Sequence, residues 1–155
     1  MQMATIRPAT GADIPAMVEL LRLLFAIEED FAVVPDRQRR GLELLLSAGE
    51  AVVLVAVNQQ EVIGMATGQL LISTAEGAPS LVTEDVVVAP AHRGKGIGSA
   101  LLQQLAGWAR QRGASRMQLL ADRTNHPALD FYRRQDWTTT RLICLRKYST
   151  TEKPL

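Results

Sequence analysis

The chain has 155 residues, of which 47% are hydrophobic and 21% charged, and its formal net charge is +1. This length suits one domain with a sizeable core, and the near-neutral charge argues against non-specific nucleic-acid binding, which depends on a large cationic field. A single cysteine, Cys144, excludes an internal disulfide and fits a reducing compartment, and we expect it to pack in the core. His92 and His126 lack a nearby His or Cys partner, so no metal site is predicted.

No apolar run reaches the ~18 residues that a membrane span needs. The first residues lack a charged head followed by an apolar core, so no signal peptide is predicted. We therefore expect a cytoplasmic protein without a membrane partner. It should form a single domain over residues 1–150, followed by a loose tail over residues 151–155.

The first half of the chain is predicted to form a strand, two helices and two further strands. Residues 5–8 favour a short strand, and a helical stripe of apolar residues follows Asp13, which can cap that helix. A second helix is predicted from about Asp36, whose side chain can cap it, to Ser47. Residues 51–57 and 62–73 read as strands. The stripe comprises Ile14, Met17, Val18, Leu21, Leu24 and Phe25.

The segment from Thr83 to Leu102 joins a strand, a glycine-rich turn and a helix. Stiff, β-branched residues at 86–88 favour a strand, which Pro90 ends because it cannot donate to a ladder. The apolar residues of the helix share one face, so that face should pack on the core. They are Ile97, Leu101, Leu105 and Ala109.

The turn between these elements has the chemistry of an anion site. Gly94, Gly96 and Gly98 can adopt backbone angles closed to other residues and let a ligand approach the main chain. The unpaired N–H groups and the positive dipole end of the helix stabilise an anion, and Arg93 and Lys95 add positive charge. These features predict a pyrophosphate site; the alternative is a tight turn without a ligand, in which both cations are solvated.

Two common phosphate-binding motifs do not fit the spacing. A P-loop needs Ser or Thr after its Gly-Lys pair, and here Gly96 follows Lys95. The dinucleotide pattern fails because Ser99 or Leu101 falls where its last glycine should be.

The remaining elements follow from local signals. Gly113 ends the helix, and residues 117–121 read as a strand that is parallel to the preceding one, since a helix joins the two. Asn125 starts another helix. Two closing strands are predicted over residues 137–140 and 141–147.

The pattern Arg93-x-x-Gly96-x-Gly98, with residues 84–88 before it and residues 101–102 after it, resembles the coenzyme A-binding core of the GCN5-related N-acetyltransferases (GNAT family). The resemblance implies an α/β fold with a mixed sheet of about seven strands flanked by about four helices. Three antiparallel strands should precede the turn, and the fourth and fifth strands should form a parallel pair that splays apart.

A second block, from Asn125 through Ala128 to Phe131 and Tyr132, is similar to the second motif of the family. It departs from that motif at Asp136, which stands in a left-handed position where the family usually has glycine. A second departure is Trp137, which replaces the usual phenylalanine.

The resemblance implies acetyl-CoA as co-substrate, an amine as acceptor and no metal. Backbone groups of Val86 and Val88 should pair with the pantetheine arm like an added strand. Tyr132 is carried over as the group near the sulfur, where its phenol can donate to a thiolate; the alternative is a buried aromatic with a satisfied hydroxyl. The coenzyme-binding residues carried over are Val86, Val87, Val88, Arg93, Gly94, Lys95, Gly96, Ile97, Gly98, Ser99, Asn125 and Tyr132.

Catalysis also needs a proton acceptor, because an alkylamine with a pKa near ~10 is mostly protonated at neutral pH. Glu84 is the candidate base, directly or through water, and Asp85 competes with it from the opposite strand face.

In the family, the first two helices and their connection form one wall of the acceptor pocket. The resemblance therefore suggests that the residues of this connection help to choose the substrate, since an acidic lip attracts a cationic amine. The alternative is a solvated loop with ordinary surface acids. The residues concerned are Glu28, Glu29, Asp30 and Phe31.

The function implied is transfer of the acetyl group of acetyl-CoA to a primary amine, on a small molecule or a protein, by direct attack in a ternary complex. A non-catalytic acyl-CoA-binding sensor is the main alternative. An acetyltransferase for aminoacyl-RNA is less favoured by the near-neutral charge. The family habit of pairing through the sheet edge or the last strands suggests a homodimer.

Overall fold

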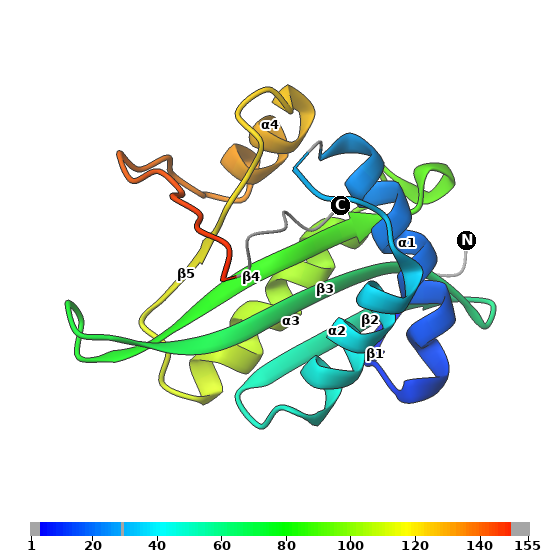
Figure 1. The fold of residues 1–155 in the computed structure, drawn as a ribbon, viewed down its shortest axis with the longest axis horizontal. Helices are drawn as coiled ribbons and strands as arrows, with labels where there is room; N and C mark the ends of the chain where they lie inside the picture. Colours follow the sequence, from blue (N-terminus) through cyan, green and yellow to red (C-terminus); the bar gives the residue numbers. More distant parts are fainter. Residues whose placement is uncertain (1–3, 29, 150–155) are drawn as a thin grey trace.

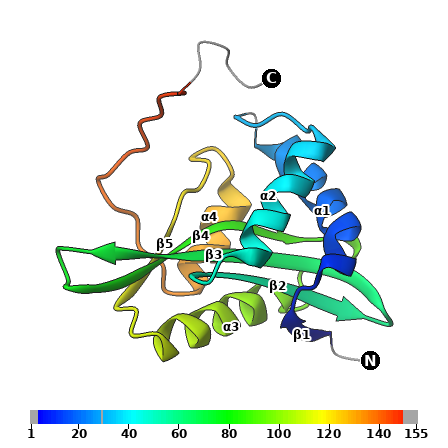
Figure 2. The same ribbon diagram turned by 60° about the horizontal axis from the view of Figure 1, so that its bottom comes forward.

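A single mixed sheet with helices on both faces makes up the fold (Figures 1 and 2). The structure is a computed structural model and describes residues 4–28 and 30–149, so Glu29 and the tail over 151–155 lie outside the described residues. The elements in chain order are β1 (Thr5–Pro8), η1 (Gly11–Asp13), α1 (Ile14–Ile27), α2 (Pro35–Ser47), β2 (Ala51–Asn58), β3 (Glu61–Ser73), β4 (Ala78–Val88), η2 (Pro90–His92), α3 (Ile97–Gln111), β5 (Arg116–Leu119) and α4 (His126–Arg134).

The strand order is β1-β2-β3-β4-β5, and all neighbours are antiparallel except β4 and β5. The predicted parallel pair is thus confirmed. Its register runs only from Ser80 opposite Arg116 to Thr83 opposite Leu119, although β4 continues to Val88. The two strands therefore splay apart beyond Thr83, as Figure 1 shows where the yellow chain leaves β5.

Two clusters of buried side chains lie on opposite faces of the sheet. One is formed with α1 and α2, and the other with α3 (Figure 2). Completely burying one large aliphatic side chain contributes about 1.5–3 kcal/mol, so these clusters hold the sheet rigid beneath the site. None of the described helices is long and apolar enough to span a membrane. The fully buried residues include Met17, Val55 and Met65 in the first cluster and Leu81, Leu101 and Leu105 in the second.

A β-bulge interrupts β4 where it begins to part from β5. Ala66 pairs with Val86 and Gly68 with Thr83, so Thr67 on β3 faces both Glu84 and Asp85. An extra residue of this kind bends a strand and increases its twist. The bulge therefore contributes to the splay and changes the direction of the two acidic side chains.

The helix caps agree with the sequence in part. Asn125 caps α4 as predicted, since its Oδ1 accepts from the N–H of Ala128 at 3.2 Å. Asp36 does not cap α2: the helix begins one residue earlier, and the N–H of Val34 donates to the side chain of Gln38 at 2.8 Å. Asp136 has φ of 62°, which confirms the left-handed position.

The two predicted closing strands do not form, so the sheet over the described residues has five strands and not about seven. Strand propensity needs a neighbour to pair with and a face to bury. Residues 137–147 find no strand to pair with, and Trp137 alone among them is half-buried. Leu142, Ile143 and Leu145 are 87%, 70% and 87% exposed, and Cys144 is exposed as well, which overturns the expected core position. The segment runs away from the sheet, as the orange-to-red trace in Figure 2 shows.

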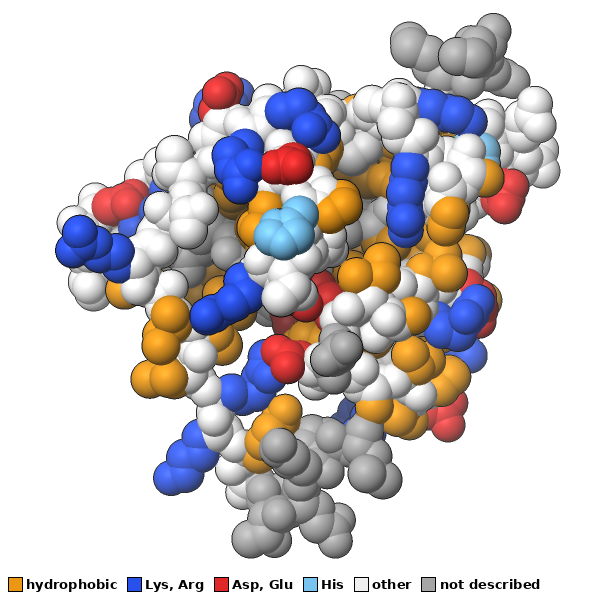
Figure 3. Space-filling model, turned by 90° about the horizontal axis from the view of Figure 1, so that it is seen from above, with side chains coloured by type: hydrophobic (Ala, Val, Ile, Leu, Met, Phe, Trp, Pro, Cys, Tyr) orange, Lys and Arg blue, Asp and Glu red, His pale blue; other side chains and the backbone are white. Residues whose placement is uncertain are grey.

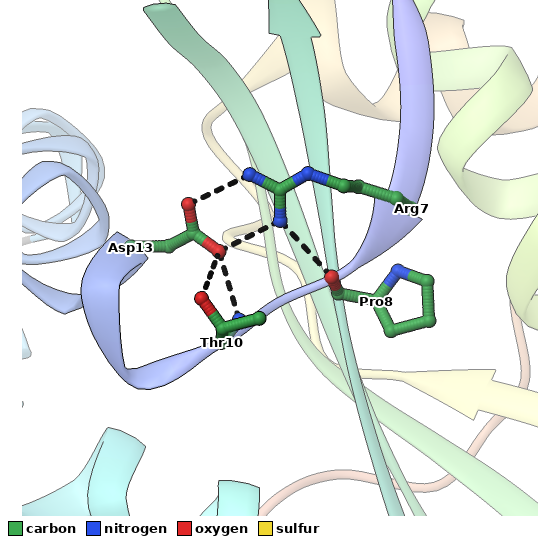
Figure 4. Close-up of polar contacts among 4 residues, drawn as sticks. All are labelled: Arg7, Pro8, Thr10 and Asp13. Carbon is green, nitrogen blue, oxygen red and sulfur yellow. Dashed lines mark hydrogen bonds and ion pairs between the residues drawn. The ribbon is translucent and has the colours of Figure 1, made fainter. Parts of the chain in front are cut away.

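Asp13 does not cap α1 with its side chain but forms a polar cluster at the start of the domain (Figure 4). Arg7 donates to both of its carboxylate oxygens, at 2.8 and 2.9 Å, and the N–H of Thr10 donates to Oδ2 at 2.8 Å. The hydrogen bond from Arg7 is the main cause that lowers the pKa of Asp13 from 3.8 to about 2, against the opposing effect of burial.

We expect Asp13→Asn to lower the free energy of unfolding by about 2 kcal/mol at neutral pH, since one pKa unit corresponds to about 1.4 kcal/mol. A lowered carboxyl pKa gives stability that is present above pH about 4 and is lost as the pH falls towards about 2. Urea denaturation across that range should show that the free energies of unfolding of the unmodified protein and of Asp13→Asn converge as the pH falls. Glu43→Gln, at an exposed site on α2, is the control. A difference that does not change with pH would contradict the ion-pair origin.

Candidate active site

The site is a cavity of about 670 Å³ where β4 and β5 part, a volume within the range of small-molecule pockets. Its walls come from the end of β4, the turn and first residues of α3, the chain after β5, α4, and the end of α1. Seen from above, the surface is hollowed at its centre, with acidic side chains inside the hollow and Lys and Arg around it (Figure 3).

The glycine turn has the predicted left-handed geometry at two of its three glycines, whereas Gly98 lies within α3 and does not adopt a positive φ. Gly94 and Gly96 have φ of 73° and 80°, in the left-handed region, and Gly96 is the N-cap residue of α3. Space around both Cα atoms is open, since no atom lies within 4 Å of where a Cβ would stand. The N–H groups of the first turn of α3 thus border the cavity, together with Gly98 and Ser99. This end of the cavity can hold an anion.

The two cations of the turn fold back onto their own loop. Arg93 Nε donates to the carbonyl of Val88 at 2.9 Å, and Lys95 Nζ donates to the carbonyl of Ala91 at 3.0 Å. Both side chains are exposed, and Arg93 lines the cavity whereas Lys95 does not. The charge of Arg93 is therefore held beside the cavity, with no acidic partner among the residues that the structure describes.

The edge of β4 that faces the splay is open. The N–H of Ala89 donates to the carbonyl of Ile63 on β3 at 2.8 Å. Because backbone groups alternate along an antiparallel ladder, the N–H and C=O groups of Val87 point towards β3, and those of Val86 and Val88 point towards the opening. The Arg93 contact occupies the carbonyl of Val88. An extended ligand arm can pair with the remaining groups of this edge.

Tyr132 projects from α4 and is half-buried beside Phe131 and Trp137, at ring-centroid distances of 5.2 and 5.7 Å. Burial, followed by the charge of Glu28, raises the pKa of Tyr132 to about 12. The phenol is consequently protonated at neutral pH and can donate a hydrogen bond into the cavity. Phe131 also fixes the start of α3, because a Cβ on Gly98 would lie 3.1 Å from its ring.

Carboxylates gather on the side of the cavity that is formed by the end of α1, β4 and the chain after β5. Glu28, at the end of α1, is half-buried, and burial followed by the charges of Asp85, Asp122, Asp30 and Glu84 raises its pKa to about 6. Burial also raises the pKa of Asp85 to about 6, against a hydrogen bond from Thr67. The sequence predicted Glu28 and Glu84 here, and both line the cavity.

Asp30 and Phe31 lie beside the cavity and do not line it. Phe31 packs on Phe25 at 5.4 Å, and Arg146 lies over its ring while pairing with Asp30 at 3.7 Å. Glu29 lies outside the described residues. Of the three predicted substrate-side residues that the structure describes, Glu28 alone lines the cavity.

Sequence reasoning missed Asp122, which lines the cavity just after β5. Its Oδ1 accepts from the N–H and the hydroxyl of Thr124, at 2.8 and 2.7 Å, and the first two causes of its lowered pKa are these contacts. A polar residue directly after the carboxyl end of a parallel strand was the available signal. Within the described part of the chain, no group of three or more His, Cys, Asp or Glu side chains could hold a metal ion.

A family model described as "Acetyltransferase (GNAT) family" matches residues 42–137. The chain is 50% identical over 54 residues to a streptothricin acetyltransferase of Streptomyces lavendulae, a match that spans 35% of this chain and 29% of the relative. A solved transcriptional regulator from Bacillus halodurans C-125 is 26% identical with a TM-score of 0.84, covering 94% of this chain and 99% of the other.

An aminoglycoside acetyltransferase from an uncultured soil metagenomic sample, solved in complex with sisomicin, has the same fold. It is 24% identical with a TM-score of 0.76, and the superposition covers 96% of this chain and 97% of the other.

Proposed function

Because this chain belongs to the GNAT family of acetyltransferases, we propose that it is an acetyl-CoA-dependent N-acetyltransferase whose acceptor is a primary amine of a small cationic molecule. The observation that carries the proposal is the open edge of β4, which lies in one cavity with a phosphate-binding turn, a protonated phenol and several carboxylates. Binding alone has no use for that phenol and those carboxylates, whereas acetyl transfer uses both.

The residues at the splay fit acetyl-CoA as co-substrate, which supplies an activated acetyl thioester. The left-handed glycines and the first N–H groups of α3 would hold the pyrophosphate. The open groups of Val86 and Val88 would bind the pantetheine arm. The other residues that we assign to the coenzyme are Val87 on β4, Arg93, Gly94, Lys95 and Gly96 in the turn, Ile97, Gly98 and Ser99 on α3, and Asn125 and Tyr132 at α4.

The acidic half of the cavity supports a cationic acceptor. Glu28, Glu84 and Asp122 line it, and the arginines that line the cavity lie on other elements, Arg93 in the glycine turn and Arg134 in α4. Clustered negative charge in a low-dielectric cleft concentrates positively charged ligands. The named activities of the relatives, on streptothricin and on an aminoglycoside, are compatible with an acceptor of this kind.

Tyr132 would act as the hydrogen-bond donor to the departing thiolate, because its phenol lines the cavity and is protonated at neutral pH. The sole cysteine, Cys144, is exposed on the segment after α4 and does not line the cavity. The amine therefore attacks the thioester directly, with both substrates bound together.

The test offers the protein acetyl-CoA with separate amines: streptothricin, sisomicin, a polyamine, an amino acid and a lysine peptide. We expect thiol release and an acetylated product with a polycationic small molecule. Its kcat/KM should be at least about 100-fold above that of an amino acid with an uncharged side chain, because each additional contact worth about 1.4 kcal/mol raises kcat/KM tenfold. Mass spectrometry identifies the product.

Two outcomes would contradict the proposal. Acetylation of the peptide alone would place the acceptor among proteins. Binding of acetyl-CoA without thiol release from any amine would favour a non-catalytic acyl-CoA sensor.

A further inference from the structure

Glu28 lies at the end of α1 and lines the cavity on the side where the carboxylates gather. Its N–H donates to the carbonyl of Leu24 at 3.1 Å, so its backbone continues the hydrogen bonding of α1. The residue is half-buried and lines the same cavity as Tyr132. Among the described residues, no hydrogen bond or ion pair is made by its carboxylate, which leaves both oxygens available to a ligand.

The charges that act on Glu28 are negative. They belong to Asp85 and Glu84 on β4, Asp122 on the chain after β5 and Asp30 on its own loop, and the charge of Glu28 acts in turn on Tyr132 of α4. Burial is the largest cause that raises the pKa of Glu28 to about 6, and the charge of Asp85 is the next. A carboxyl group with this pKa is ionised at neutral pH and is a stronger base than an ordinary glutamate.

The competing carboxylates are less suited to accept a proton from the substrate. Glu84 lines the cavity but is exposed to solvent. Asp85 does not line the cavity, and its Oδ2 accepts from the hydroxyl of Thr67 at 2.9 Å while its N–H donates to the same hydroxyl at 3.2 Å. Asp85 is thereby fixed behind the cavity wall, where its charge acts on Glu28 without contact with a substrate.

We propose that Glu28, whose carboxylate lines the cavity without a partner among the described residues, is the general base of the transfer, and that Asp85, held in place by Thr67, is a positioning residue that contributes to its basicity. The inference rests on the proposed function. It assigns the proton acceptor to the end of α1, whereas the sequence favoured Glu84 or Asp85 on β4.

The protons balance in this scheme. The acceptor ammonium gives one proton to the carboxylate of Glu28, and the free amine forms the C–N bond as the C–S bond of the thioester breaks. The thiolate takes a proton from the phenol of Tyr132. The nitrogen releases its second proton as the amide forms, and this proton restores the phenol through solvent, so the proton on Glu28 is the one net proton that leaves to water.

The first test measures the basicity of Glu28 without any acceptor. In protein labelled with 13C-glutamate, the carboxyl resonance that disappears in Glu28→Gln should titrate with a pKa of about 6 and move towards the ordinary 4.5 in Asp85→Asn. An ordinary value in the unmodified protein would overturn the role of Glu28. A value that Asp85→Asn leaves unchanged would overturn the role of Asp85.

The second test follows kcat/KM against pH with streptothricin, or with the panel amine that gives thiol release. We expect an acid limb near pH 6 in the unmodified protein and in the surface control Glu43→Gln, and a limb that persists at a lower pH in Glu84→Gln, because the charge of Glu84 is one of the causes that raise the pKa of Glu28. Glu28→Gln should lose this limb and about 100-fold in kcat/KM at neutral pH, with the Kd for acetyl-CoA unchanged, because general bases contribute 10²- to 10⁴-fold.

The failures of the two proposals are distinguishable. A limb that persists in Glu28→Gln, or that disappears in Glu84→Gln, overturns the assignment of the base while the acetyltransferase activity stands. Absence of thiol release from the unmodified protein with every amine overturns the proposed function, and the catalytic role of Glu28 with it.

Discussion

Replacing Tyr132 by phenylalanine should lower kcat by about 100-fold while the Kd for acetyl-CoA changes by less than about twofold, since general acid catalysis contributes 10²- to 10⁴-fold. We take the lower end because a thiolate is a good leaving group, with a thiol pKa of about 8.5. The substitution removes only the hydroxyl and keeps the ring packed against Phe131 and Trp137. Steady-state thiol release and calorimetric titration with acetyl-CoA measure the two quantities.

Tyr148 is the matched control for this experiment, because it is the other tyrosine of the chain and lies on the segment after α4, 36% exposed. Tyr148→Phe should leave both quantities unchanged. If the two variants lost activity equally, or if Tyr132→Phe lost acetyl-CoA binding instead of turnover, the phenol would not be the donor to the sulfur.

The second large effect is the loss of the stabilisation by acetyl-CoA when the glycine turn, which we propose holds the phosphates, is substituted. Acetyl-CoA at about 100 times its Kd should stabilise the protein by about 2.7 kcal/mol and raise its Tm by about 5–10 °C, and Gly96→Val should reduce this rise to less than about 1 °C. A branched side chain at the N-cap of α3 would stand where the phosphates approach the backbone. Thermal denaturation with and without acetyl-CoA measures the shift.

Gly113 provides a control with the same backbone strain. Its φ is 78° against 80° at Gly96, and neither position has an atom within 4 Å of where a Cβ would lie. Gly113→Val should therefore lower the Tm of the free protein by a similar amount but keep the full response to acetyl-CoA, since Gly113 lies beyond the other end of α3. A response retained in Gly96→Val would show that the turn does not hold the coenzyme.

The parts of the site that local rules govern were predictable from the sequence. β-Branched residues at 86–88 followed by alternating glycines specify a strand, a turn and a helix start within a dozen residues, and the structure has all three. Asn125 specifies the start of α4 in the same way, because its side chain accepts a hydrogen bond from the N–H of the residue three positions later. Such signals do not depend on the remainder of the fold.

The parts that depend on distant contacts were not predictable. The residues over 137–147 include strand-forming side chains, but they find no strand to pair with, and Leu142, Ile143 and Leu145 stay exposed. Glu28 looked like one member of a short surface run of acids. Its burial, and with it its basicity, arises only because the end of α1 meets β4 and the chain after β5, which are far away in the sequence.

The central claim is that an amine bound in the acidic half of the cavity attacks acetyl-CoA directly at the splay of β4 and β5. Initial rates of thiol release, measured while acetyl-CoA and the acceptor are varied together, test it most directly. We predict double-reciprocal lines that intersect, because both substrates must be bound before the acetyl group moves. Parallel lines, which indicate that the protein itself carries the acetyl group between two separate steps, would contradict the account.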